Sequence, residues 1–238
     1  MTSDLRSPLD KVRGRATRLR RDLGLLPRYP MVRLHDRLAD LTLVPRAQFV
    51  DNLVVARRAR SVPGDLVECG TWRGGMSAAL AWALPNRHSV LLDSFEGLPD
   101  AKEIDGPAAV HWSTVLRDHD NCTAEERCAH DAMARVGQTD YELVPGWFED
   151  TVPVYARRQR PISVLRLDGD WYDSTMVCLR HLFPLVQTNG IVIIDDYFDW
   201  DGCSRAVHDY LADLGSADRL RTSRADEFAY IVKSDDAG

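Results

Sequence analysis

Four aspartates follow two apolar segments in the C-terminal half of the chain. Asp168 and Asp170 come at the end of the first segment, and Asp195 and Asp196 come at the end of the second. Apolar runs joined by a helical segment are typical of parallel strands in a buried sheet, and a right-handed crossover places their carboxyl ends at one edge. We therefore expect the four carboxylates to converge where open α/β sheets bind ligands. Carboxylates in such numbers repel one another, so a hard metal ion is their natural partner.

The chain before these strands supplies the first half of the expected sheet. A short strand at 66–69 is followed by a glycine-rich turn at 70–77 and an alanine-rich helix at 78–84. Such a turn lets backbone approach a ligand closely at a helix N-terminus. It matches neither the lysine-containing phosphate loop nor a clean dinucleotide fingerprint. A second strand, 89–93, ends in Asp93, whose carboxylate either binds ribose hydroxyls or caps the following loop.

A long polar segment, 94–140, separates the second strand from the third. Loops of this length in a compact domain are usually functional, and its first part is interpreted as a lid. The part at 122–136 is predicted to be helical. A third strand, 141–144, ends in an aromatic turn at 145–148, which either sandwiches a purine or belongs to the core.

The C-terminal segments complete the alternating pattern. A helix over 174–186 connects the two aspartate-bearing strands, and Pro184 should kink it or shorten its last turn. A further helix, 204–214, precedes a polar hairpin with strands near 220–222 and 228–232. The chain is therefore predicted to form an α/β sandwich with five parallel strands and a terminal antiparallel hairpin.

Residues 1–62 are predicted to form a helical arm in front of an α/β domain at 63–238. Apolar residues at steps of three and four indicate an amphipathic helix over 5–23, which the prolines at 27 and 30 break. A second helix is predicted over 46–60. Because the arm cannot bury its apolar stripe alone, we expect it to pack on the body or on a second subunit. The residues of the second helix expected to face inward are Phe49, Leu53, Val54 and Ala56.

The charge is distributed unevenly. Residues 1–60 carry fourteen Lys and Arg against six Asp and Glu, the rest carries sixteen against thirty, and the net charge is −6. A basic arm can bind nucleic acid, but no aromatic residues interleave the arginines of 6–21, which disfavours that partner.

No apolar run has membrane-spanning length and no apolar signal core follows the N-terminus, so we expect a cytoplasmic protein. The five cysteines show no CxxC spacing, which disfavours structural zinc and a disulfide framework.

Five short motifs occur in order along the chain: ECGTWRGG at 68–75, LDSFEGLP at 92–99, GWFEDT at 146–151, LDGDWYDST at 167–175 and IDDY at 194–197. Together they resemble the macrocin O-methyltransferase family. Its members O-methylate deoxysugar hydroxyls on macrolides, aminocoumarins and related bacterial natural products. The resemblance covers roughly residues 45–235, and it is specific because all five motifs stand in the same order.

The resemblance implies a class I methyltransferase (Rossmann-like) fold, S-adenosylmethionine as methyl donor and a divalent ion, usually Mg²⁺. It implies that Asp168, Asp195 and Asp196 hold the metal and that Asp170 is the general base. For Asp170, capping of the next helix and additional metal ligation are the alternatives. The resemblance also implies homo-oligomers that form through the N-terminal helices. The residues expected to contact the donor are Glu68, Gly70, Thr71, Trp72, Gly74, Gly75, Ser77, Asp93, Ser94, Gly146, Trp147, Phe148 and Asp168.

These observations predict an O-methyltransferase that acts on a sugar hydroxyl of a bacterial secondary metabolite, that is, on a small-molecule glycoside or diol acceptor. A metal beside the hydroxyl lowers its pKa, and a general base then takes its proton. One alternative acceptor is a catechol-type phenol, whose adjacent oxygens also chelate a metal. Another alternative is a non-catalytic, nucleic-acid-binding protein. Trp171 stands where many family members are expected to carry a smaller aliphatic residue, so the acceptor differs from a typical macrolide sugar if this ring borders its pocket.

Overall fold

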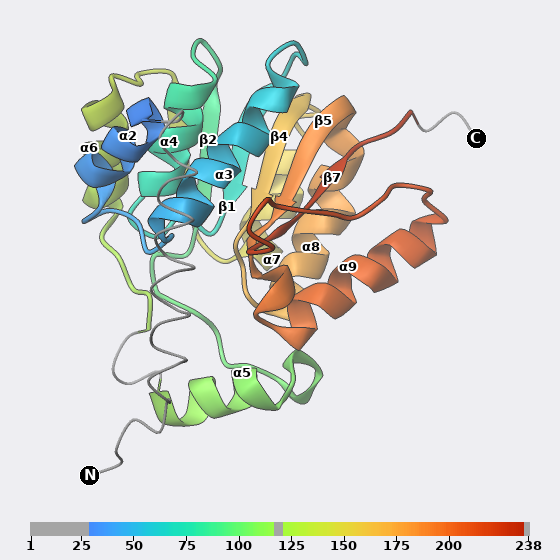
Figure 1. Ribbon diagram of the computed structural model, residues 1–238. Helices are drawn as coiled ribbons and strands as arrows, with labels where there is room; N and C mark the ends of the chain where they lie inside the picture. Colours follow the sequence, from blue (N-terminus) through green and yellow to red (C-terminus); the bar gives the residue numbers. More distant parts are fainter. Residues whose placement is uncertain (1–28, 117–120, 236–238) are drawn as a thin grey trace, which may run out of the picture.

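A seven-stranded sheet forms the middle layer of the computed structural model, which describes residues 29–116 and 121–235 (Figure 1). The strand order is β3-β2-β1-β4-β5-β7-β6. The first five strands are parallel, and β7 pairs antiparallel with both β5 and β6. This confirms the predicted fold class. The strands are β1 Asp65–Cys69, β2 Ser89–Asp93, β3 Tyr141–Pro145, β4 Ile162–Leu167, β5 Val186–Ile194, β6 Arg221–Thr222 and β7 Ala229–Val232.

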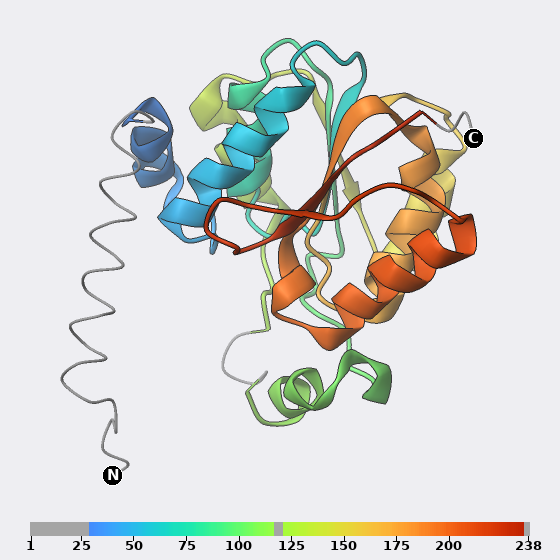
Figure 2. The same cartoon turned by 45° about the vertical axis from the view of Figure 1, so that its right-hand side comes forward.

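Helices cover both faces of the sheet (Figures 1 and 2). Along β1 the side chains alternate, so that Leu66 faces one apolar core while Val67 and Cys69 face the other. The first core is covered by α2 Tyr29–Leu38, α3 Arg46–Ala56, α4 Gly75–Ala83 and α6 Glu126–Val136. The second is covered by α7 Phe148–Ala156, α8 Tyr172–Leu182 and α9 Asp201–Leu214.

The connection between the two aspartate-bearing strands follows the prediction closely. Helix α8 ends at Leu182, and Pro184 lies in the 3-10 turn Phe183–Leu185 that follows. Pro184 thus shortens the helix, as expected from its missing N–H. The apolar run at 190–194 indicated a strand that begins at Gly190, but strand β5 begins at Val186. The Asn-Gly pair at 189–190 lies inside this strand, whose register with β4 is irregular.

Several helices were not predicted. Helix α2 is one of them: Pro30 lies in its first turn, where a missing N–H costs nothing. Helix α7 forms around an internal Pro153 because Val152 and Tyr155 are buried on the sheet. The segment interpreted as a lid contains a 3-10 turn (Glu103–Asp105), α5 (Pro107–His111) and a π-helical turn (Trp112–Leu116), which project beyond the carboxyl edge of the sheet in Figure 1.

The N-terminal helices belong to the body of the molecule. The helix predicted over 5–23 lies outside the described residues. Helix α3 buries Phe49, Leu53 and Ala56 as expected, whereas Val54 is only partly buried. Residues from Met31 to Val62 share one apolar core with residues of α4 and β2, so the described part of the predicted arm is packed on the α/β body.

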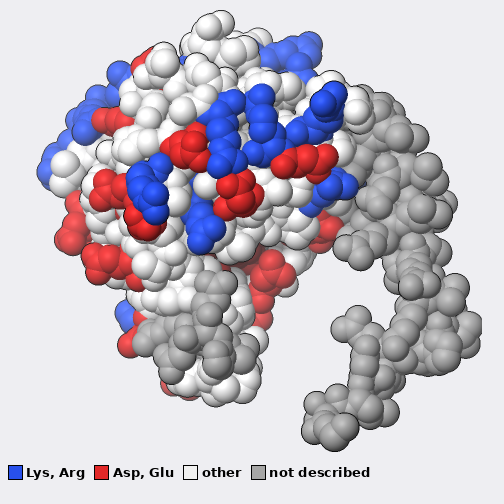
Figure 3. All heavy atoms as spheres, turned by 90° about the vertical axis from the view of Figure 1, so that its left-hand side faces the viewer, with Lys and Arg blue, Asp and Glu red and all other residues white. Residues whose placement is uncertain are grey.

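Acidic and basic side chains are interspersed on the face that carries α2 and α6 (Figure 3). Arg135 of α6 pairs with both Asp40 and Asp131, and Arg46 pairs with Asp36. Arg135 and Arg46 thus each have an acidic partner on this face. Within residues 29–116 and 121–235, no helix is both long and apolar enough to span a membrane.

Candidate active site

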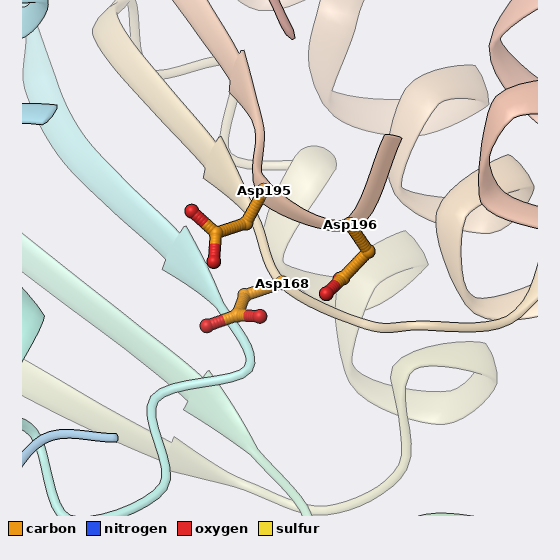
Figure 4. A group of neighbouring side chains, drawn as sticks. All are labelled: Asp168, Asp195 and Asp196. Carbon is orange, nitrogen blue, oxygen red and sulfur yellow. The ribbon is translucent and has the colours of Figure 1, made fainter. Parts of the chain in front are cut away.

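The topology brings three of the four aspartates into one cluster. Asp168 follows β4, while Asp195 and Asp196 begin the 3-10 turn after β5. One carboxylate oxygen from each lies within 4.8 Å of the others, and the three side chains face one another (Figure 4). The cluster opens into a cleft beside the β1–β4 pair, where the strand order reverses and where doubly wound sheets bind ligands.

Arg166 ties this cluster to the first strand of the sheet. Its side chain is fully buried in β4, and its Nη1 donates to Glu68 Oε1 at 2.6 Å and to Asp168 Oδ2 at 2.7 Å. Its Nη2 lies 2.8 Å from Asp195 Oδ1. A single guanidinium thus pairs with three carboxylates, and the geometry fixes where Asp168 and Asp195 point.

Helix α3 closes the network from the N-terminal side. Gln48 Nε2 donates to Asp195 Oδ2 at 3.1 Å, and Asn52 Oδ1 accepts from Arg166 Nε at 3.2 Å. Asn52 is fully buried and in turn donates to the backbone carbonyl of Gln48. The N-terminal section therefore positions the candidate metal ligands.

The charge balance of the cluster fits a divalent cation. Burial, opposed by Arg166 and reinforced by Asp195, raises the pKa of Asp168 to about 8. Burial, followed by the charges of Asp170, Asp168 and Asp195, raises the pKa of Asp196 well above its usual range. One guanidinium does not neutralise so many carboxylates, and three converging carboxylate oxygens are the donors that Mg²⁺ prefers.

Asp170 sits beside the cluster but takes a different conformation. Its φ of +57° is left-handed, so the strand does not continue through it and its side chain need not lie on the same face as Asp168. Its backbone N–H donates to Asp196 Oδ2 at 3.1 Å, and its Oδ1 accepts the indole N–H of Trp200 at 2.9 Å. Burial raises the pKa of Asp170 to about 6, so the carboxylate is ionised at neutral pH and takes up a proton more readily than an ordinary aspartate.

The glycine-rich turn forms the other half of the cleft. Asp93 Oδ2 accepts the backbone N–H groups of Thr71 and Trp72 at 2.6 and 2.7 Å, and its Oδ1 accepts that of Phe95 at 2.7 Å. This carboxylate therefore caps the loops on either side of it, as one of the two interpretations from the sequence expected. It also lines the cleft, and a carboxylate has about four lone-pair sites, so a ribose hydroxyl can still bind.

We expect Gly70→Ala to destabilise the protein more than Gly137→Ala. Both glycines have left-handed φ angles, +86° and +73°, which cost an alanine about 1–2 kcal/mol. A Cβ on Gly70 would lie 1.7 Å from the carbonyl oxygen of Asp168, whereas one on Gly137 meets nothing within 4 Å. Overpacking of this kind adds about 1–3 kcal/mol. Equilibrium urea unfolding measures the free energy of unfolding of both variants. Equal losses would contradict the close contact between Gly70 and the Asp168 carbonyl.

The remaining donor residues predicted from the sequence fall into two groups. The cleft is lined by Glu68, Gly70, Thr71, Trp72, Asp93, Ser94, Trp147, Phe148 and Asp168. The other four support it from behind: Ser77 donates to Glu68, Gly75 N–H donates to the Leu41 carbonyl, Gly146 N–H donates to the Asp93 carbonyl, and Gly74 packs on Ala129.

Trp171 does not border the cleft. The residue is 2% exposed, its Nε1 donates to the Pro99 carbonyl at 2.9 Å, and its ring centroid lies 5.8 Å from that of Trp112 and 5.1 Å from that of Trp200. The Trp171 ring therefore does not contact an acceptor bound in the cleft, and the condition under which it would change the acceptor is not met.

Sequence reasoning missed Arg166, Gln48, Asn52 and Trp200. Only Arg166 carried a signal, because a charged residue inside an apolar strand must find buried partners. The others act across large separations: Gln48 and Asp195 are 147 residues apart. No local pattern marks such a contact.

Comparison with known proteins identifies related chains. A family model described as Macrocin-O-methyltransferase (TylF) matches residues 41–224. Demethyldecarbamoylnovobiocin O-methyltransferase of Streptomyces niveus is 38% identical over 173 residues, which are 68% of this chain and 63% of that protein. Mycinamicin III 3''-O-methyltransferase of Micromonospora griseorubida is 34% identical over 167 residues, 67% of this chain and 65% of that protein. The matched part thus spans slightly under two thirds of these curated relatives.

Solved structures show the same fold. The O-methyltransferase NovP has a TM-score of 0.66 and 30% identity, over 79% of this chain and 81% of that one. The calicheamicin methyltransferase CalS11 has a TM-score of 0.64 and 23% identity, over 97% and 95%. The more distant MycE, at 16% identity and a TM-score of 0.53 over 87% of this chain and 56% of that one, was solved with Mg, SAH and mycinamycin VI.

Proposed function

Because the chain belongs to the macrocin O-methyltransferase family, we propose that it transfers a methyl group from S-adenosylmethionine to a sugar hydroxyl of a bacterial natural product. The observation that carries this proposal is a cleft lined by both the glycine-rich turn and the aspartate cluster. Gly70 packs directly on the Asp168 backbone, so a donor on the turn lies next to an acceptor at the cluster.

The donor half of the cleft is assigned to the ends of β1, β2 and β3. The turn at 70–72 faces the methionine part, Asp93 accepts from the ribose, and Trp147 and Phe148 flank the base. Aromatic faces suit an adenine ring, and a carboxylate suits vicinal hydroxyls.

The acceptor half is assigned to the aspartate cluster. Asp168, Asp195 and Asp196 are the residues that would hold Mg²⁺. The ion supplies positive charge that lowers the pKa of an adjacent hydroxyl. Asp170 accepts the hydroxyl proton on Oδ2, because its Oδ1 is already hydrogen-bonded to Trp200. The oxygen–methyl bond then forms as the carbon–sulfur bond breaks, and S-adenosylhomocysteine leaves.

The segment at 41–45 gives the cleft an apolar rim. Leu43, Val44 and Pro45 line it, and Leu43 is 58% exposed at its mouth. An exposed apolar rim beside a polar cluster suits a sugar attached to an apolar scaffold. This supports the choice of a glycoside over a free sugar as acceptor.

The acceptor class is tested by mass spectrometry after incubation with S-adenosylmethionine, Mg²⁺ and a panel of glycosides and simple catechols. We expect a mass increase of one methyl group on a glycoside. Turnover of a catechol without turnover of any glycoside would favour the phenolic alternative. Failure of every acceptor, together with no binding of S-adenosylhomocysteine by calorimetry, would contradict the proposal.

Removal of divalent ions is expected to abolish methyl transfer. Dialysis against EDTA should reduce turnover to background, and added Mg²⁺ should restore it, because the clustered carboxylates require a cation to hold the acceptor. Asp195→Ala should lose this rescue, whereas Asp209→Ala, on the outer surface of α9, should keep it. Full activity in EDTA would contradict the metal assignment.

A further inference from the structure

The carboxylate of Asp170 is held by one side chain that lies outside the cleft. Trp200 precedes α9, and its indole Nε1 donates to Asp170 Oδ1 at 2.9 Å. Its backbone N–H donates to the Asp196 carbonyl at 3.1 Å, so the ring is anchored next to the cluster. Among the described residues, no other side chain donates a hydrogen bond to Asp170. Trp200 is therefore the side chain that orients the Asp170 carboxylate at the edge of the cleft.

The Trp200 ring is itself held by a chain of aromatic contacts. Its centroid lies 5.1 Å from that of Trp171 in an edge-to-face arrangement, and the Trp171 centroid lies 5.8 Å from that of Trp112. Trp171 is almost fully buried, and its N–H donates to the carbonyl of Pro99, a residue that lines the cleft. The aromatic chain thus joins Asp170 to the segment 99–112.

A second contact fixes that segment to the same place. The buried Asp105 accepts the backbone N–H of Tyr172 at 2.7 Å and that of Lys102 at 2.7 Å. Gly202 allows α9 to approach, because a Cβ there would lie 2.3 Å from Asp105 Oδ1. The segment, the start of α8 and the start of α9 are therefore locked together around the tryptophans.

We propose that Trp200 is a positioning residue for Asp170, and that Trp171 holds the Trp200 ring against the segment 99–112. The inference rests on the proposed function, in which Asp170 is the base. A base must stand within hydrogen-bond reach of the proton that it takes, and small displacements cost about 10²-fold in rate. The Trp200 N–H bonds one oxygen of Asp170 at 2.9 Å and so stabilises the side-chain rotamer that reaches it.

The test is Trp200→Phe, which keeps an aromatic ring and removes the N–H donor. We expect kcat to fall by about 10- to 10²-fold. The KM for the acceptor and the Kd for S-adenosylhomocysteine should stay within about twofold. The matched control is Trp82→Phe on the opposite helical layer, which should leave all three values unchanged. Parallel loss of donor affinity and kcat in Trp200→Phe would indicate a merely structural role and overturn the inference.

Combination with Asp170→Asn separates this inference from the proposed function. When Trp200→Phe is added to the Asp170→Asn variant, it should cost no further activity, because the group that it positions is gone. Inactive Asp170→Asn together with fully active Trp200→Phe would overturn the role of Trp200 and leave the base intact. Fully active Asp170→Asn would overturn the base itself.

A readout independent of activity is the indole N–H region of the NMR spectrum. The protein has six tryptophans, and the Trp200 resonance is identified by its loss in Trp200→Phe. In the protein without donor or metal, Asp170→Asn should move this resonance upfield, because a neutral amide is a weaker acceptor than a carboxylate. An unchanged Trp200 resonance would overturn the hydrogen bond.

Discussion

Asp170→Asn is expected to reduce methyl transfer by about 10²–10⁴-fold, the usual contribution of a general base. The amide has nearly the same shape as the carboxylate and tolerates the left-handed backbone at this position. It cannot, however, take up the proton of the acceptor hydroxyl. Single-turnover measurements with saturating donor and acceptor isolate this step from product release.

Binding of donor and metal should survive this change. Asp170 is not one of the three aspartates whose oxygens converge, and its contacts run to Trp200 and to the Asp196 carboxylate. Calorimetry with S-adenosylhomocysteine and with Mg²⁺ should therefore give values close to wild type. Loss of Mg²⁺ binding would instead identify Asp170 as a further ligand, the alternative that the sequence left open.

Asp173→Asn is the matched control, because Asp173 lies three residues further along the same motif. Its side chain is 62% exposed and pairs with Lys102 outside the cleft, since neither residue lines it. Turnover should stay within about twofold of wild type, as expected of an exposed ion pair. Near wild-type turnover in Asp170→Asn would contradict the assignment of the base.

The convergence of the aspartates could be predicted because it depends only on topology. Two parallel strands with a right-handed connection must end at one edge, whatever surrounds them. Asp168, Asp195 and Asp196 meet for that reason, and the contact of Gly70 with Asp168 follows from the pairing of β1 with β4. Side chains that immediately follow paired strands are thus placed by the sheet itself.

The environment of the cluster could not be predicted in the same way. Trp200 and Asp170 are 30 residues apart, and Asn52 and Arg166 are 114 apart, so their contacts depend on how helices pack. Within the polar segment, the helix at 126–136 was predicted, but the two helical turns at 107–116 were not. Each is only five residues long, too short for a periodic pattern, and they are attached to the body through Asp105, which accepts from Tyr172, and through Trp112, which packs on Trp171.

Arg166→Met is expected to lower the free energy of unfolding by about 3–5 kcal/mol. Methionine fills much of the same volume, so the change removes charge and hydrogen bonds with little loss of packing. It leaves Glu68, Asp168 and Asp195 without their common cation in a buried site. Removal of one partner of a buried ion pair is costly because the remaining charges are desolvated and unpaired.

Arg158→Met is the control for this measurement. Arg158 also pairs with a glutamate, Glu142, but its side chain is 47% exposed, so its loss should cost about 1 kcal/mol or less. Arg166→Lys keeps the charge without the forked geometry and should fall between wild type and Arg166→Met. Chemical denaturation of the three variants under identical conditions measures the free energy of unfolding of each. If Arg166→Met is as stable as Arg158→Met, the Arg166 guanidinium does not hold the ends of β1, β4 and β5 together. The sheet alone would then position the candidate metal ligands.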